Sequence, residues 1–208
     1  MVVIHYTAMG SAEDAIARLC DPDFEVSAHY LIAACGRIVR MVDEDQRAWH
    51  AGAGQWGDVT DINSRSIGIE LANIGSVPFC AAQMDALEKL LRDIKTRYEI
   101  APERVIGHSD MAPSRKIDPG PRFDWQRLAR QHLSVWPQKL TPLRVDDAAF
   151  FADLSTFGYS AETPSTARLS AFRDRFRPRH AGAVDGIDMA MARDLAMRFP
   201  VDRKAYTA

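Results

Sequence analysis

Short runs of β-branched and apolar residues alternate along the chain with longer stretches in which apolar residues recur at helical spacing. The short runs predict strands, which cover residues 2–4, 26–32, 37–42, 66–71 and 105–108. The helical stretches cover residues 11–20, 82–97 and 124–132. Strands interleaved with helices, with one hairpin among them, predict an α/β fold with a central mixed β-sheet flanked by helices.

The last third of the chain has a different pattern. Apolar residues fall at helical spacing over residues 146–157, 165–176 and 188–199. Three short helices cannot bury much apolar surface alone, so we expect them to pack against the first unit. The chain is therefore predicted to hold two domains, residues 1–137 and a small C-terminal three-helix domain at residues 138–208. A frayed tail is expected from about Asp202.

Composition and charge narrow the possible partners. Of the 208 residues, 47% are hydrophobic and 26% are charged, which is typical of a soluble globular protein. The net charge of -2 favours neither nucleic acid nor an anionic membrane surface, and no apolar run approaches the length of a membrane span. We therefore expect no nucleic-acid partner and no membrane-spanning segment. The spacing of the three cysteines matches no zinc-binding pattern, so we expect buried or idle thiols.

The start of the chain bears on its compartment. Met1 leads directly into the first predicted strand, with no signal peptide. As the chain stands we expect a cytoplasmic protein, whereas an export signal removed before Met1 would place it in the periplasm or at the outer membrane. The sequence does not fix the oligomeric state, and we expect a monomer.

The stretch at residues 107–120 contains the strongest candidate chemistry. It begins at a strand end with His108 and continues as an irregular loop that returns Lys116 and Asp118. Histidine and aspartate are good zinc ligands, and a catalytic zinc needs three protein ligands and one open position. His5, at the end of the first strand, is the best candidate for the third ligand. A histidine at a strand end is more often a hydrogen-bonded residue than a ligand, so residue types alone leave both interpretations open.

Other polar residues lie where a site could use them. Glu70 is flanked by apolar residues in its strand, so it either points into a site at the sheet edge or is a partnered polar residue. Trp49 and His50 open a Gly-rich loop, and long loops inside compact domains are often functional. Asp110 and Arg115 are expected to be structural or surface charges.

Five segments, taken together and in this order, resemble the zinc-dependent N-acetylmuramoyl-L-alanine amidases of the amidase type 2 family, relatives of the peptidoglycan recognition proteins. The segments are residues 3–7, 26–32, 47–52, 66–71 and 107–120. The AmiD-like branch of that family carries a small helical peptidoglycan-binding domain at the C-terminus, and residues 157–159 and 184–186 resemble its motif. Members of that branch are typically exported and lipid-anchored, which differs from the start of this chain.

The resemblance implies a site and an activity. His5, His108 and Asp118 would be the ligands of one Zn²⁺ per chain, and Glu70 and Lys116 would be the catalytic pair. The implied reaction is hydrolysis of the amide bond between N-acetylmuramic acid, or its 1,6-anhydro form, and L-alanine in peptidoglycan or muropeptides. A non-catalytic peptidoglycan recognition module is the alternative from a different class, and a zinc peptidase acting on another amide is a third.

Three further residues in the matching segments are candidates for substrate binding. His50, beside Trp49 at a loop, is expected to contact the substrate. His29, in a predicted strand, is interpreted as structural or as lining the cleft. For the C-terminal domain the functional interpretation is cell-wall binding, and the alternative is a structural buttress with no ligand of its own.

Overall fold

The computed structural model describes residues 1–138 and 141–202, and within them five strands form one sheet in the order β3-β2-β4-β1-β5. Strands β1, β2, β4 and β5 run parallel, and β3 pairs antiparallel with β2. The predicted central mixed sheet is therefore confirmed. The strands are β1 (Val2–Tyr6), β2 (Tyr30–Ile32), β3 (Ile38–Arg40), β4 (Ile67–Leu71) and β5 (Val105–Gly107).

Strand β2 is shorter than the sequence pattern predicts. Residues 26–29 precede the strand, and the backbone N–H of Ser27 donates to the carbonyl of Trp49 instead of to a neighbouring strand. This segment is therefore tied to the Gly-rich loop, at the rim of the fold.

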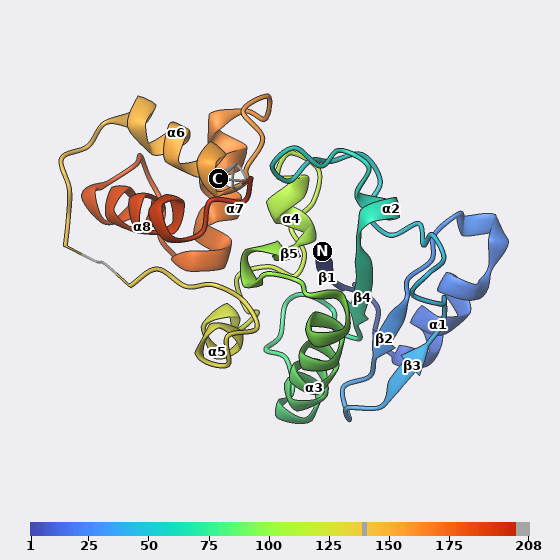
Figure 1. The fold of residues 1–208 in the computed structure, drawn as a ribbon. Coiled ribbons are helices and arrows are strands. Elements are labelled where there is room, and N and C mark those ends of the chain that lie inside the picture. Colours follow the sequence, from blue (N-terminus) through green and yellow to red (C-terminus); the bar gives the residue numbers. More distant parts are fainter. Residues whose placement is uncertain (139–140, 203–208) are drawn as a thin grey trace.

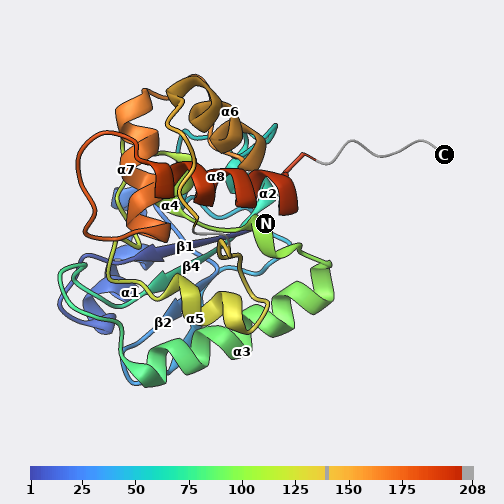
Figure 2. The same cartoon turned by 90° about the vertical axis from the view of Figure 1, so that its left-hand side faces the viewer.

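Each face of the sheet is covered by a different set of helices (Figures 1 and 2). Side chains alternate between faces along a strand, so Val2 and Ile4 point to one face and Val3 to the other. The face of Val2 and Ile4 packs against α3 (Ala81–Tyr98) and α5 (Trp125–Arg130). The face of Val3 packs against the C-terminal helices, and nearer β2 it is covered by α1 (Ala12–Cys20).

The three C-terminal helices form one hydrophobic core with the sheet. They are α6 (Asp147–Phe157), α7 (Ser165–Phe176) and α8 (Gly186–Arg198), coloured orange to red in Figure 1. Trp56 from the Gly-rich loop is fully buried between the two parts, and its ring lies edge-on to Phe157 and Tyr159, with centroids 5.3 and 5.1 Å away. The expected packing of this bundle against the first unit is confirmed, whereas the division at residue 137 stays a prediction.

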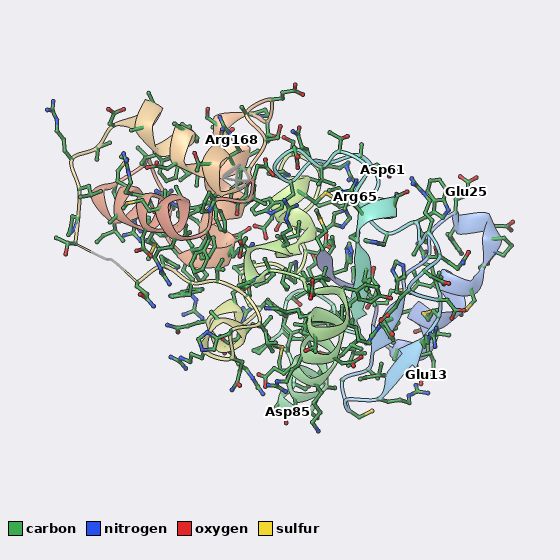
Figure 3. All side chains as sticks on the ribbon, viewed as in Figure 1. Glu13, Glu25, Asp61, Arg65, Asp85 and Arg168 are labelled. Carbon is green, nitrogen blue, oxygen red and sulfur yellow. The ribbon has the colours of Figure 1, made fainter. Side chains whose placement is uncertain are left out.

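Two short helices lie outside the segments that the sequence pattern predicts as helical. Helix α2 (Ile62–Arg65) begins where the Asp61 carboxylate accepts the N–H of Ser64, and Figure 3 shows Asp61 and Arg65 at its two ends. Helix α4 (His108–Met111) lies in the stretch expected to be irregular after His108, so that prediction is wrong. The local reason is a hydrogen bond of 2.8 Å from the N–H of Gly107 to Asp110, which closes the first turn.

Smaller features complete the described fold. Short 3₁₀ turns span Pro22–Phe24 and Pro102–Arg104. The three cysteines form no disulfide and are exposed, so they are not buried. No helix in the described ranges has the length and apolarity needed to cross a membrane. The expected tail lies outside the described residues after Asp202.

Candidate metal centre and active-site cleft

The sheet brings three chemical groups to the carboxyl ends of its central parallel strands. His5 on β1 is in register with Glu70 on β4, so the two side chains leave the same face of the sheet side by side. Ile4 is in register with Gly107 on β5, which places His108 just beyond the strand, beside His5. Carboxyl ends of parallel strands are a common location for binding sites.

The three predicted metal ligands converge. Nδ1 of His5 lies 2.9 Å from Nδ1 of His108 and 3.0 Å from Oδ2 of Asp118, and the third side of this triangle measures 3.1 Å. All three side chains are buried. Asp118 reaches the site because its backbone carbonyl accepts the N–H of Ser109 at 2.9 Å, which ties the returning loop to the start of α4.

The chemistry of this donor set fits a divalent metal ion. Two imidazoles and one carboxylate are a ligand set of catalytic zinc sites, which keep one position open. Ligand atoms around a tetrahedral zinc are about 3.3 Å apart, so a few tenths of an ångström of expansion suffices. Nε2 of His108 lies 2.8 Å from the carbonyl of Ala51 and must donate to it, which leaves Nδ1 unprotonated as a ligand. Burial lowers the pKa of His5 to about 4, which keeps this ring in the neutral form that metals require.

Glu70 and Lys116 both line the cleft that contains the candidate ligands. Burial, assisted by the charge of Asp118, raises the pKa of Glu70 to about 8, while the positive charge of Lys116 opposes this rise. Among the described residues, Oε2 of Glu70 has no hydrogen-bond partner. A buried carboxyl with a raised pKa beside a metal-ligand cluster is a common feature of catalytic sites. The two predicted catalytic residues therefore line the same cleft as the candidate metal ligands.

The cleft has a volume of about 550 Å³, and its outer wall includes Trp49 and Ile117. Trp49 is 55% exposed and the guanidinium of Arg47 stacks on its ring at 4.3 Å, so it offers a flat apolar surface to a substrate. His50 also lines the cleft, but it is buried, and its Nδ1 lies 3.0 Å from Nε2 of His5.

His29 lies beneath the site, and both of its ring nitrogens are engaged. Nδ1 accepts the N–H of Gly68 at 2.9 Å, and Nε2 lies 3.1 Å from the carbonyl of Gln46. His29 does not line the cleft that contains the metal ligands. These contacts fit the structural interpretation of His29 that the sequence left open, and substrate binding by it stays a prediction.

Two residues that the sequence analysis did not assign to the site shape its wall. Oδ1 of Asn63 accepts the N–H groups of His50 and Ala51 at 3.1 and 2.8 Å, which fixes the loop behind the metal centre. Arg115 donates to the carbonyls of Ala51 and Ala53 at 2.6 and 2.5 Å and also lines the cleft. Nothing in the sequence pattern around Asn63 or Arg115 predicts these contacts.

Comparisons with known proteins agree with this geometry. Residues 1–121 match the profile of the N-acetylmuramoyl-L-alanine amidase family. N-acetylmuramoyl-L-alanine amidase AmiD of Escherichia coli K12 is 37% identical, over 97% of this chain and 84% of the relative. The solved complex of E. coli AmiD with anhydro-N-acetylmuramic acid-L-Ala-D-γ-Glu-L-Lys has a TM-score of 0.89, with 38% identity, and covers 97% of this chain and 90% of that one.

A second relative also matches both parts of the chain. The structure of AmpDh3 from Pseudomonas aeruginosa in complex with an anhydromuramic pentapeptide has a TM-score of 0.85 and 30% identity. It covers 96% of this chain and 92% of that one, so the C-terminal helices are included in the match. By its profile match, its relatives and its fold, the chain belongs to the N-acetylmuramoyl-L-alanine amidase family.

Proposed function

We propose that this protein hydrolyses the amide bond between N-acetylmuramic acid, or its 1,6-anhydro form, and L-alanine in peptidoglycan or muropeptides. One Zn²⁺ per chain would be held by His5, His108 and Asp118. The observation that carries the proposal is the triangle of three ligand atoms, 2.9 to 3.1 Å apart, in the same cleft as the buried carboxyl of Glu70. The relatives named above support the choice of substrate, because both are solved in complex with an anhydromuramic peptide.

Glu70 and Lys116 would have different roles in amide hydrolysis. When bound, zinc supplies a Lewis acid that polarises a carbonyl and acidifies water. The Glu70 carboxylate accepts a proton from the attacking water as the new C–O bond forms, and returns it to the amine nitrogen as the C–N bond breaks. The Lys116 ammonium faces the oxygen that gains negative charge. The products are a lactyl carboxylate and a peptide with a free L-alanine amine.

A product analysis tests the activity. Purified protein is incubated with defined muropeptides, intact and 1,6-anhydro, with and without a chelator, and the products are identified by mass. We expect release of the stem peptide with its L-alanine amine free, and loss of release when the chelator is present. A cut at another bond, or the same cut in the presence of the chelator, would contradict the proposal.

Matched variants test the two catalytic roles. Glu70→Ala and Lys116→Ala should each lower turnover about a hundredfold or more, while zinc content stays at about one per chain. Glu13→Gln on α1 (Figure 3) and Lys89→Ala on α3 replace exposed charges outside the cleft and serve as controls. Normal turnover in either site variant would remove that residue from the mechanism.

The same assay separates the amidase from a non-catalytic recognition module. A recognition module would bind muropeptides and leave them intact at any zinc concentration. The ligand geometry favours the enzyme, because the three side chains and the buried carboxyl of Glu70 have no need to share one cleft for recognition alone.

A further inference from the structure

The ring of His50 lies directly behind His5, on the side away from the other two candidate metal ligands. Nδ1 of His50 is 3.0 Å from Nε2 of His5, and the two rings are nearly perpendicular, with centroids 5.1 Å apart. The other ring nitrogen of His5, Nδ1, points to His108 and Asp118. His50 therefore contacts the nitrogen of His5 that would not bind the metal.

Hydrogen bonds beyond His50 determine where the protons are. The hydroxyl of Ser66 donates its one proton to the carbonyl of Ile62 at 2.6 Å, so its oxygen can only accept from the other side. Nε2 of His50 lies 3.2 Å from that oxygen and must carry the proton of this bond. A neutral imidazole has one N–H, so Nδ1 of His50 is then an acceptor.

The protonation of His50 determines which nitrogen of His5 carries a proton. Because Nδ1 of His50 accepts, Nε2 of His5 must donate to it, and Nδ1 of His5 is left with a free lone pair. This lone pair points toward Nδ1 of His108, which the carbonyl of Ala51 leaves unprotonated in the same way. Both rings therefore present the tautomer that a metal ion needs.

The position of His50 is built into the fold. A Cβ on Gly68 of β4 would lie 2.4 Å from Cγ of His50, so only glycine leaves room for the ring over the strand. Oδ1 of Asn63 on α2 accepts the backbone N–H of His50 at 3.1 Å. The carbonyl of Ile62, which accepts the hydroxyl of Ser66, lies on the same helix. Gly68 on β4 and helix α2 therefore fix the positions of the His50 ring and of the Ile62 carbonyl.

We propose that His50 is a positioning residue for the metal centre, which fixes the tautomer of His5 through the relay His5–His50–Ser66–Ile62. This inference rests on the proposed function, since it assigns His50 a role toward the same zinc ion. It also changes the expected role of His50, which the sequence analysis places in contact with the substrate.

Zinc affinity of the full-length protein is the first test, measured by competition with a chromophoric chelator. His50→Leu keeps an apolar side chain in the ring's place and removes the acceptor, and we expect zinc to bind about 10- to 100-fold more weakly. His50→Asn places an amide oxygen near the position of Nδ1, so it should retain most of the affinity. His132→Asn is the control, since His132 is exposed, lies outside both clusters that could hold a metal ion, and has a positive φ that asparagine tolerates.

The second test reads the tautomer directly. Long-range ¹H–¹⁵N spectra of the metal-free protein distinguish protonated from unprotonated ring nitrogens. We expect Nδ1 of His5 to be unprotonated in the wild type and in His50→Asn, and partly protonated in His50→Leu. Ser66→Ala, which removes the acceptor for His50 without touching either ring, should shift the populations in the same direction. It provides the measurement if His50→Leu does not fold.

The outcomes separate this inference from the proposed function. If the wild type binds one zinc and His50→Leu binds it equally well with an unchanged His5 tautomer, the relay has no role and the proposed function stands. If the wild type binds no zinc, both proposals fail. Gly68→Ala gives an independent check, because displacing the ring should weaken zinc binding as removing it does, while wild-type affinity in this variant would contradict the relay.

Discussion

A buried ion pair joins helix α7 in the C-terminal part of the chain to helix α4, which begins at the candidate ligand His108. The loss of unfolding free energy when this pair is broken should show how far the two helices stabilise each other. Arg175 on α7 donates to Oδ2 of Asp110 on α4 at 2.6 Å, and both side chains are 1% exposed. Arg175 also donates to the carbonyl of Val105 and the hydroxyl of Ser134, at 3.1 and 3.0 Å. Helix α4 begins at His108, so Arg175 supports a candidate ligand from a distant part of the chain.

The expected cost follows from what remains after Arg175→Met. The Asp110 carboxylate stays buried and keeps two donors, the N–H of Gly107 at 2.8 Å and the hydroxyl of Tyr159 at 2.6 Å. Removing one partner of a buried ion pair costs about 3–5 kcal/mol, because the other charge is left uncompensated. With two hydrogen bonds retained, we expect a loss near the lower end, about 3 kcal/mol.

Urea denaturation of the metal-free protein measures this loss as a lower midpoint with an unchanged slope. Arg40→Met is the matched control, since Arg40 and its partner Asp43 are 61% and 66% exposed and their pair should contribute about 0–1 kcal/mol. Adding Asp110→Asn to Arg175→Met removes the unpaired charge and should restore part of the stability. Equal midpoints for Arg175→Met and Arg40→Met would refute the buried-pair reasoning.

Three more predictions concern the site. The pKa of Glu70 is raised to about 8, so its neutral form stabilises the metal-free fold below about pH 4.5, and this contribution is lost as the pH rises to about 8. The difference in unfolding free energy between wild type and Glu70→Gln should therefore change by up to about 1.4 kcal/mol per pH unit, and a flat difference would contradict this. Zinc at about 100 times its Kd should raise the unfolding free energy by about 2.7 kcal/mol in the wild type and much less in His5→Ala, as seen in thermal or urea unfolding. If the exposed ring of Trp49 contacts the substrate away from the reacting atoms, as predicted, Trp49→Ala should raise KM for muropeptides with little change in kcat; a fall in kcat alone would be inconsistent with this role.

The sequence pattern predicts what depends on periodicity and residue type. Strand β1 lies where a run of apolar residues predicts a strand, and α3, with Leu87, Leu91 and Ile94 buried, lies where the helical spacing of apolar residues predicts a helix. The convergence of His5 and His108 follows from strands that end at one edge of a sheet. These features are local, or follow from the rules of sheet topology.

What the sequence pattern does not predict depends on contacts between distant segments. Helix α4 forms because Asp110 accepts the N–H of Gly107, and that carboxylate is held in turn by Arg175, 65 residues further along the chain. The place of His50 behind His5 requires a glycine on a neighbouring strand. No periodicity encodes such pairings, because each depends on the packing of the finished fold.

The order in which the candidate metal centre can assemble during synthesis follows from where its three predicted ligands lie in the chain. His5 leaves the ribosome more than a hundred residues before Asp118, and strand β5, which pairs with β1, lies between them in the sequence. A nascent chain that ends before Asp118 offers a metal ion an incomplete set of ligands. If these three residues bind zinc, the complete ligand set therefore becomes available only after Asp118 has been synthesised, so metal binding would accompany or follow the folding of the first 118 residues.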